Sequence, residues 1–371
     1  MVILNKVIDL FSGCGGFSVG FEKAGFNITK AVEYDKQISY SYKMNHKNTE
    51  MLNFDISTID NENYFTRNEA DVIIGGPPCQ GFSMAGARIR GTFIDDPRNY
   101  LFKHYLNIVK IVKPKVFIIE NVKGILTMEN GKIFDEIVKS FENKDNFNGD
   151  YYHVEHRIVK CSEFGIPQKR ERVIIIGVLN KTIDIGEIIN IVRDKVEIKY
   201  PTFFDKVSVW DAIGNLPVAV SEGMVKNPSP TNGYQRYLSS QNVDIYNHNF
   251  HKHNGKSIER MKKINAGENY EVLDEHINSV HSGSYGRLSK DDVASTITTR
   301  FDTPSGGRFI HPVENRTITP REAARIQSFP DDFIFYGSKS IICRQIGNAV
   351  PPKVAYFFAN VVREILNEYY K

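Results

Sequence analysis

The feature that most constrains the fold is a regular alternation of two kinds of segment between residues 6 and 179. Short runs rich in β-branched residues alternate with longer stretches whose apolar residues recur at helical spacing. This alternation is typical of α/β proteins with a doubly wound sheet of parallel strands and helices on both faces. The expected strands are 6–11, 27–33, 71–75, 115–119, 153–159 and 172–179, and the expected helices are 17–25, 34–45, 99–112 and 132–141.

The second half of the chain has a different character. From about residue 181 the alternation ends, several prolines appear, and residues 239–254 are rich in Ser and Asn. We therefore expect a separate, irregular domain there, whose strands the sequence does not locate. A helix should begin after Thr319, because Pro320 suits the first helical position and Glu322 completes a capping box. Residues 351–370 should form a final amphipathic helix.

Composition narrows the classes of function. No apolar run approaches the ~20 residues needed to cross a bilayer, and no export signal begins the chain, so we expect a cytoplasmic protein. The four cysteines are widely spaced and the His-rich run 248–253 lacks paired cysteines, so we predict neither a metal site nor a disulfide framework. The formal net charge of +3 is too small to decide whether the protein binds nucleic acid.

Residues 71–83 present one thiol, that of Cys79, just after an expected strand. Gly75 and Gly76 let the chain turn, and Pro77 and Pro78 prevent the strand from continuing. Ligands of open α/β sheets bind at the carboxyl ends of strands, so this is a suitable place for a nucleophile. An isolated cysteine is more often a buried, inert apolar residue, but the Pro-Pro-Cys-Gln context favours the reactive role.

A glycine-rich turn joins the first strand to the first helix and contains Gly13, Gly15 and Gly16. Such a turn lets a ligand approach the backbone near a helix N-terminus, although many are only tight turns. Ser18 occupies the place of the third glycine of a dinucleotide fingerprint, and Glu33 follows about 20 residues later, where an acidic side chain holds ribose hydroxyls. The pattern favours an adenosine without a diphosphate.

Further polar residues should reach the same sheet edge. Glu120 follows a strand as Cys79 does, and a shielded carboxyl group there could donate a proton, although such residues are more often structural. Arg170 and Arg172 are two residues apart at the start of the last strand and should share a face, suited to binding carbonyl or phosphate oxygens. Residues 80–99 are long for an ordered connection and are rich in Gly, Ser and Arg, as expected of a closing loop.

Together with residues 316–331 and 345–351, these segments closely resemble the motifs of the DNA cytosine-5 methyltransferase family, in the family's order. The resemblance covers most of residues 6–179 and 296–360, and only about 185–290 lacks a family signature. It implies a Rossmann-like methyltransferase domain of residues 1–180 and 341–371, interrupted by a smaller target-recognition domain of residues 181–340. The cofactor would be S-adenosylmethionine.

The resemblance also implies residue roles. Cys79 would bond to C6 of a flipped-out cytosine, Glu120 would hydrogen-bond or protonate N3, and Arg170 and Arg172 would steady the O2 side. The implied cofactor-binding residues are Phe11, Ser12, Gly13, Gly15, Gly16, Glu33, Tyr34, Asp55, Ile56, Pro78, Leu101, Asn348 and Val350. The implied DNA-binding residues are Gln80, Ser83, Arg88, Arg90, Arg98 and Thr296.

The expected partner is double-stranded DNA, bound by a monomer associated with the nucleoid, and a separately acting restriction endonuclease is a further candidate partner. One alternative is a transfer-RNA cytosine-5 methyltransferase of the same fold, but the Cys-Phe-Thr segment typical of that branch is missing. Another alternative is a catalytically silent DNA-binding relative, which the joint presence of Cys79, Glu120 and Arg172 disfavours.

Overall fold

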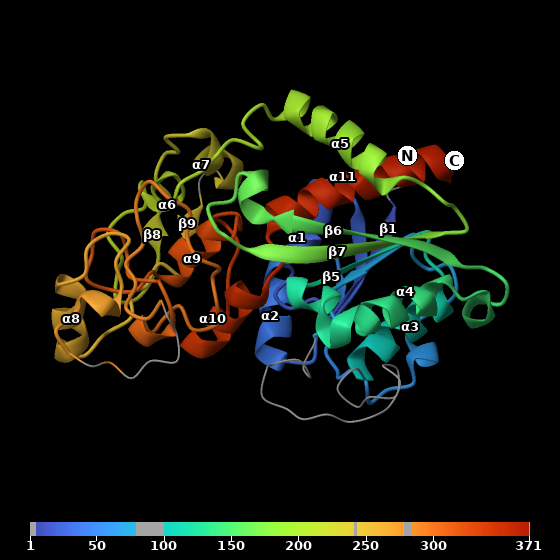
Figure 1. Ribbon diagram of the computed structural model, residues 1–371, viewed down its shortest axis with the longest axis horizontal. Helices are drawn as coiled ribbons and strands as arrows, with labels where there is room; N and C mark the ends of the chain where they lie inside the picture. The colour runs from blue at the N-terminus through green and yellow to red at the C-terminus, as the bar shows by residue number, and fades with distance from the viewer. Residues whose placement is uncertain (1–4, 79–99, 241–242, 276, 278–282, 371) are drawn as a thin grey trace.

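The computed structural model describes residues 5–78, 100–240, 243–275, 277 and 283–370. Within them lies a seven-stranded sheet with the strand order β3-β2-β1-β4-β5-β7-β6, flanked by helices on both faces (Figure 1). Its strands are β1 (Lys6–Leu10), β2 (Asn27–Val32), β3 (Glu50–Leu52), β4 (Val72–Gly75), β5 (Val116–Val122), β6 (Tyr152–Lys160) and β7 (Glu171–Leu179). The predicted α/β class is confirmed, since this is the fold of known DNA methyltransferase structures.

The sheet is covered on both faces because alternate strand residues point in opposite directions. Val72 and Ile74 of β4 belong to a core with α1 (Gly16–Lys23), α5 (Ile185–Lys199) and α11 (Pro352–Tyr369). Ile73, between them, belongs to a second core with α3 (Tyr100–Val112) and α4 (Lys132–Glu142). These two layers of helices explain the long apolar runs in the strands, which have no solvent-facing side.

Helices α1 and α11 pack closely although they lie far apart in the sequence. A Cβ added to Gly20 of α1 would come within 2.4 Å of the Ala355 Cβ of α11, so only glycine permits this approach. Much of α11 is buried, including Phe357, Val361 and Ile365. The C-terminal helix is therefore an integral part of the core on this face of the sheet.

Strand β7 runs antiparallel to both of its neighbours, β5 and β6, so the prediction of an all-parallel sheet is wrong at this strand. The physical reason is the connection between β6 and β7, residues 161–170, because parallel neighbours need a crossover of a dozen or more residues. The reversal puts the first residues of β7 beside the last residues of β5, where Arg172 is paired in register with Val122.

A third core includes Phe301, Phe329 and Phe333 and takes residues from α2 (Lys36–Asn45), α6 (Val209–Ile213), α7 (Gly233–Leu238), α9 (Pro320–Ile326) and α10 (Lys339–Asn348). Helix α8 (Gly255–Lys262) contributes Met261 to a separate, smaller cluster. The short strands β8 (Val225–Lys226) and β9 (Asp244–Ile245) pair with each other. The predicted capping box is confirmed at the start of α9, and the predicted final helix is α11. None of the helices in the described parts of the chain is both long and apolar enough to cross a membrane.

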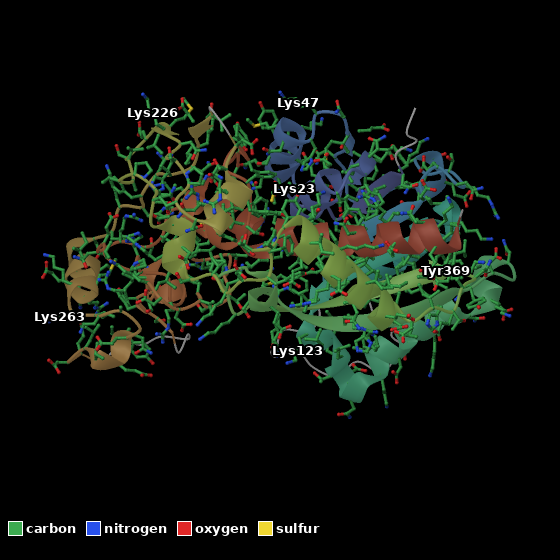
Figure 2. All side chains as sticks on the ribbon, turned by 90° about the horizontal axis from the view of Figure 1, so that it is seen from above. Lys23, Lys47, Lys123, Lys226, Lys263 and Tyr369 are labelled. Atoms are coloured by element: carbon green, nitrogen blue, oxygen red, sulfur yellow. The ribbon has the colours of Figure 1, made fainter. Side chains whose placement is uncertain are left out.

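Figure 2 shows the elongated molecule from above, with Lys226 and Lys263 towards one end and Tyr369 at the other. Lys23 of α1 lies between them, and its Nζ donates to the Tyr237 carbonyl of α7 at 3.2 Å. Helix α5, which follows the expected domain boundary at residue 180, packs its buried side chains into the core that contains α11. The division of the chain into two domains stays a prediction.

Candidate functional site

One edge of the sheet gathers most of the predicted site residues. The ends of the parallel strands lie in register, since Leu10 pairs with Val32 and with Gly75, and Gly75 pairs with Ile119. Phe11, Glu33, Gly76 and Glu120 follow or end these strands and therefore reach the same edge. The carboxyl ends of parallel strands are the usual place for ligands in such folds.

The glycine turn is held in a conformation that favours glycine. Gly13 and Gly15 have φ values of 56° and 98°, and Phe11 also has a positive φ. The Gly13 N–H donates to Glu33 Oε2 at 3.1 Å, and the Asp35 N–H donates to Glu33 Oε1 at 2.8 Å. Burial raises the pKa of Glu33, although these two backbone hydrogen bonds oppose the shift. Glu33 thus ties the turn after β1 to the turn after β2.

The surroundings of Glu33 suit a nucleoside. The Tyr34 ring is 63% exposed, and Phe11 and Leu101 are partly buried against the core that contains Ile56. Asp55 is exposed, and hydrogen bonds from the Ser57 hydroxyl and N–H lower the pKa of its carboxyl group. Accessible ring faces and carboxylates are the groups that bind a heterocycle, its amino group and ribose hydroxyls.

Residues near the C-terminus return to the glycine turn. A Cβ added to Gly16 would lie 2.5 Å from the Val350 carbonyl oxygen, so this backbone approach requires glycine. The Cys14 thiol lies 3.7 Å from the Gln345 carbonyl oxygen. Asn348 is exposed and Val350 is buried. Both predicted C-terminal cofactor residues therefore belong to a segment that contacts the turn. Ser12, within the turn itself, is held to the end of β2, since its N–H donates to the Val32 carbonyl.

The turn after β4 is fixed against the end of β5. Asn121 Nδ2 donates to the Pro77 carbonyl at 3.1 Å, and a Cβ added to Gly76 would lie 3.3 Å from Glu120 Oε2. Pro78, the last described residue here, is exposed. The predicted residues of the following segment lie outside the described residues: Cys79, Gln80, Ser83, Arg88, Arg90 and Arg98.

Glu120 and Arg172 form an ion pair across β5 and β7, with Arg172 Nε 2.9 Å from Glu120 Oε1. Both side chains are largely buried. In the described part of the structure, however, Glu120 Oε1 accepts no hydrogen bond of good geometry, so its distance from Arg172 Nε marks a charge contact. A buried carboxylate oxygen with unused acceptor capacity is suited to receive a donor from a ligand.

Arg170 lies differently from the prediction that it works beside Arg172 on a ligand. It is 1% exposed, and its guanidinium donates to the carbonyls of Ile297, Gly347 and Ala349 at 3.0–3.4 Å. Burial and the charge of Arg172 lower the pKa of Arg170 to about 10. These contacts hold the segments around 297 and 347–349 against the start of β7.

Thr296 is brought to the same place by backbone pairing. Its Oγ1 donates to the Lys169 carbonyl at 3.1 Å, and Lys169 N–H donates to Ala294 O. Thr296 is half-buried at the start of β7. Two histidines of the run 248–253 contact other residues of the second half of the chain. His248 lies between Thr319 Oγ1 and the Pro217 carbonyl, and His253 Nε2 accepts from the Thr317 N–H.

Two supporting features were not predicted. The first is Asn121, whose side chain holds the turn at Pro77. In the sequence, only its place directly after Glu120 could have indicated this role. Beneath the glycine turn, the Ser18 hydroxyl contacts Asp9 at 2.6 Å and the Tyr42 hydroxyl at 2.7 Å. Burial raises the pKa of Asp9 to about 8. Ser18, predicted only as a missing glycine, therefore takes part in a buried polar network.

Comparisons with known proteins agree with this geometry. The family model described as C-5 cytosine-specific DNA methylase matches residues 5–364. The chain is 35% identical to the type II methyltransferase M1.HphI of Haemophilus parahaemolyticus, over 96% of this chain and 86% of the relative. It is 34% identical to M.DdeI of Desulfomicrobium norvegicum, over 96% of this chain and 90% of the relative.

Solved structures show the same fold. A crystal structure titled as a DNA modification methyltransferase encoded within a prophage (E. coli) aligns with a TM-score of 0.73 and 30% identity, covering 98% of this chain and 100% of that one. The S. pombe Dnmt2 methyltransferase aligns with a TM-score of 0.61 at 16% identity, covering 99% and 100% of the two chains, which shows a shared fold alone.

Proposed function

This chain belongs to the C-5 cytosine-specific DNA methylase family and is a DNA (cytosine-5-)-methyltransferase, and we propose that Cys79, Glu120 and Arg172 carry its chemistry. Cytosine C5 is a weak nucleophile, so electrons must first enter the ring. In the proposed reaction the Cys79 thiolate bonds to C6 while the protonated Glu120 carboxyl group hydrogen-bonds or protonates N3, which neutralises the negative charge that develops on the ring. C5 then bonds to the methyl group, and loss of the C5 proton and of the thiolate restores the ring as 5-methylcytosine.

The observation that carries this proposal is the free acceptor capacity of Glu120 at the edge of the sheet. Its Oε1 is buried yet accepts no well-formed hydrogen bond from the described residues, and Oε2 faces the turn at Gly76. Arg172 holds the carboxylate from the neighbouring strand and supplies a cation for the O2 side. We assign Arg170 a positioning role, because its guanidinium is already bonded to three backbone carbonyls.

Enzymes of this family depend on S-adenosylmethionine, which supplies the methyl group when bound. The residues of this structure fit such a molecule. Glu33 would hold the ribose hydroxyls, Asp55 would accept the adenine amino group, and Phe11 would lie against the ring. Gly13, Gly15 and Gly16 would give the amino-acid part access to the backbone, since a Cβ at Gly13 would meet no atom within 4 Å. The other predicted contacts would complete this site.

The substrate of a DNA methyltransferase is DNA, and the proposed substrate form is a duplex from which the target cytosine is flipped, at a cost of a few kcal/mol. Gln80, Ser83, Arg88, Arg90, Arg98 and Thr296 are the proposed DNA contacts at the catalytic side. We further propose that residues 181–340 read the sequence of the target site, inserted between the two parts of the catalytic domain. Because relatives are named type II methyltransferases, a restriction–modification system is the proposed setting, with a separate endonuclease and a monomeric methyltransferase.

The covalent mechanism is tested with duplex DNA synthesised with 5-fluorocytosine in place of cytosine. Fluorine blocks loss of the C5 substituent, so incubation with S-adenosylmethionine should give a protein–DNA adduct that survives denaturant. The Cys79→Ala variant should form none. An enzyme that methylates ordinary duplex DNA yet forms no adduct would contradict the proposal. Transfer of labelled methyl to transfer RNA but not to duplex DNA would favour the alternative substrate.

A further inference from the structure

Helix α2 (Lys36–Asn45) carries three polar side chains that bond, one after another, to a segment near the C-terminal end of the third core. Asn45 Oδ1 accepts from the Ile334 N–H and Nδ2 donates to its carbonyl, both at 2.8 Å. Ser41 Oγ accepts from the Tyr336 N–H at 2.8 Å. Gln37 Oε1 accepts from the Ser338 N–H at 3.1 Å. We call these three side chains, with their partners in residues 334–338, the polar ladder.

The spacing of the ladder is a geometric match. Residues four apart on a helix share a face and are separated by ~6 Å along its axis. Alternate residues of an extended chain are separated by ~6.6 Å. Three helix residues spaced four apart can therefore meet residues 334, 336 and 338 of a segment that runs the opposite way, with a bend at Gly337, whose φ is 124°. All of these hydrogen bonds require the same alignment of the two segments. Helix α2 therefore cannot slide or rotate against residues 334–338 without breaking several of them.

One end of α2 is joined to the predicted cofactor site. Asp35 caps the helix by accepting from the N–H groups of Gln37 and Ile38, and its own N–H donates to Glu33 Oε1 at 2.8 Å. Arg344 of α10 forms an ion pair with Asp35, and its charge acts to lower the pKa of Glu33 against the larger effect of burial. Helices α2 and α10 lie side by side in Figure 1.

The segment that the ladder binds lies in the third core, to which α2 also contributes Ile38. Phe333 and Phe335, which flank Ile334, are buried in that core with Phe329. Asn247, also in the second half of the chain, bonds to the backbone of Phe335. Its Nδ2 donates to the Phe335 carbonyl at 2.9 Å, and its Oδ1 accepts from the Phe335 N–H at 3.0 Å. Residues 334–336 are thus held by α2 and by the segment around 247 together.

From these contacts we propose that Gln37, Ser41 and Asn45 are positioning residues that couple the cofactor site to the DNA-reading part of the chain. A ligand that fixes Glu33 also fixes Asp35, and with it α2 and the segment that the ladder holds. Cofactor occupancy therefore sets the position of the third core relative to the catalytic edge and strengthens DNA binding. This inference rests on the proposed function, since it takes S-adenosylmethionine to bind at Glu33 and residues 181–340 to bind DNA.

The test measures the affinity of the full-length protein for a duplex containing its mapped target, with and without S-adenosylhomocysteine. The ratio of the two dissociation constants is the coupling factor, which is typically ~5–150-fold for linked sites. We expect a factor in this range for the wild type and a factor within about 2-fold of unity for Asn45→Ala. The binding of S-adenosylhomocysteine alone is measured by calorimetry for each variant.

Asn247→Ala is the matched control. It removes a matching pair of amide hydrogen bonds, made to Phe335 rather than to Ile334, from the same segment. Because Asn247 has a φ of 64°, alanine there adds strain as well. It should lower the melting temperature at least as much as Asn45→Ala while keeping the coupling factor, because the burial of Phe333 and Phe335 still ties the segment to the third core. A loss of coupling in both variants, or in neither, would overturn the proposal in favour of a purely structural ladder.

A milder pair of variants keeps the test decisive if Asn45→Ala does not fold. Gln37 is exposed, so Gln37→Ala should fold and lower the coupling factor, while Gln37→Glu keeps the acceptor for Ser338 and should restore it. Equal coupling in both Gln37 variants and in the wild type would contradict the proposal. If the wild type binds S-adenosylhomocysteine but shows no coupling, the inference fails alone. If it binds none, the proposed cofactor site itself is wrong.

Discussion

In the sheet, neighbouring strands satisfy each other's backbone hydrogen bonds, whereas in the third core and its surroundings buried arginine side chains do much of this work. Arg287 donates to the carbonyls of Ile264, His311, Glu314 and Met261, and Arg321 to those of Tyr246, Pro330 and Phe333. A guanidinium offers five N–H donors, enough to serve several loops that lack a strand partner. The proposed catalytic side chains at the sheet edge can therefore be changed with little effect on the fold, while single arginines elsewhere cannot.

The largest expected effect is on catalysis at the sheet edge. Glu120→Gln keeps the shape of the side chain but removes its charge and its capacity to hold a proton for N3. We expect methyl transfer to slow by about 10²–10⁴-fold. The melting temperature should fall only modestly, because strand pairing holds residue 120 and Arg172, which loses its charged partner, keeps its hydrogen bond to the Glu171 carbonyl. A large fall in the melting temperature of Glu120→Gln, measured by circular dichroism, would contradict the proposed difference between the two regions.

The next largest effect should be on stability in the second region. Arg321→Met keeps the volume of a fully buried side chain but leaves three carbonyls without their donor. Since each unsatisfied buried group costs about 1–3 kcal/mol, we expect the free energy of unfolding in urea to fall by about 3 kcal/mol or more. Arg157→Met is the control within the sheet, where Arg157 is half-exposed and bonds to Glu155 and its own neighbour's carbonyl. It should change stability by less than about 1 kcal/mol.

A smaller effect should come from the residue that joins the two strand ends at the site. Asn121→Ala removes the hydrogen bond to the Pro77 carbonyl, which should cost about 1 kcal/mol of stability. The turn that precedes Cys79 would lose its anchor, so we expect kcat to fall about tenfold or more. The Michaelis constant for S-adenosylmethionine should stay unchanged, since Glu33 is not affected. An unchanged kcat in steady-state assays would show that Asn121 has no positioning role.

A last effect, which varies with pH, separates the two regions by their buried acids. Burial raises the pKa of Asp9 to about 8, although the hydrogen bond from the Ser18 hydroxyl opposes the shift, so the folded state binds a proton that the unfolded state releases. Its stabilising contribution is complete below about pH 4 and is lost as the pH rises towards 8, by at most about 1.4 kcal/mol per pH unit. Asp9→Asn should flatten the fall in melting temperature between pH 5 and 8.

Glu322 should behave in the opposite way. Burial alone would raise its pKa, but hydrogen bonds and charge from Arg316 lower it to about 2. Its contribution is complete above the unfolded value of about 4.5 and is lost as the pH falls towards 2. Glu322→Gln should therefore lower stability at neutral pH and change it little near pH 2. Identical pH profiles for the Asp9 and Glu322 variants would contradict this assignment.

The sequence predicted the sheet region well because its signals are local. Runs such as Val72 to Ile74 are buried on both faces, and the Thr319 capping box is formed as predicted. The direction of β7 was predicted wrongly, because the alternation of residues along a strand does not indicate its direction. The short connection at 161–170 does indicate it, since a parallel neighbour would need a longer crossover. That reversal is what brings Arg172 to Glu120, so the ion pair followed from tertiary structure rather than from the spacing of residues.

The second region was not predicted in detail because its order comes from long-range side-chain contacts. Strands β8 and β9 are two residues long and give no period to detect. Arg170 was predicted to contact a ligand, yet its partners Ile297, Gly347 and Ala349 are more than 120 residues away. A guanidinium that binds backbone carbonyls and one that awaits a substrate are indistinguishable in a sequence, because both need only an arginine.

The close packing of α11 on α1 has a consequence for how the protein is made. During synthesis, residues 352–366 leave the ribosome long after the strands they cover, so until then α1 and α5 can cover this face of the growing sheet only in part. The nascent chain must keep that apolar face from aggregating while the whole middle of the sequence is being translated. Methylating activity can therefore arise only late in synthesis, when the last helix closes over the first.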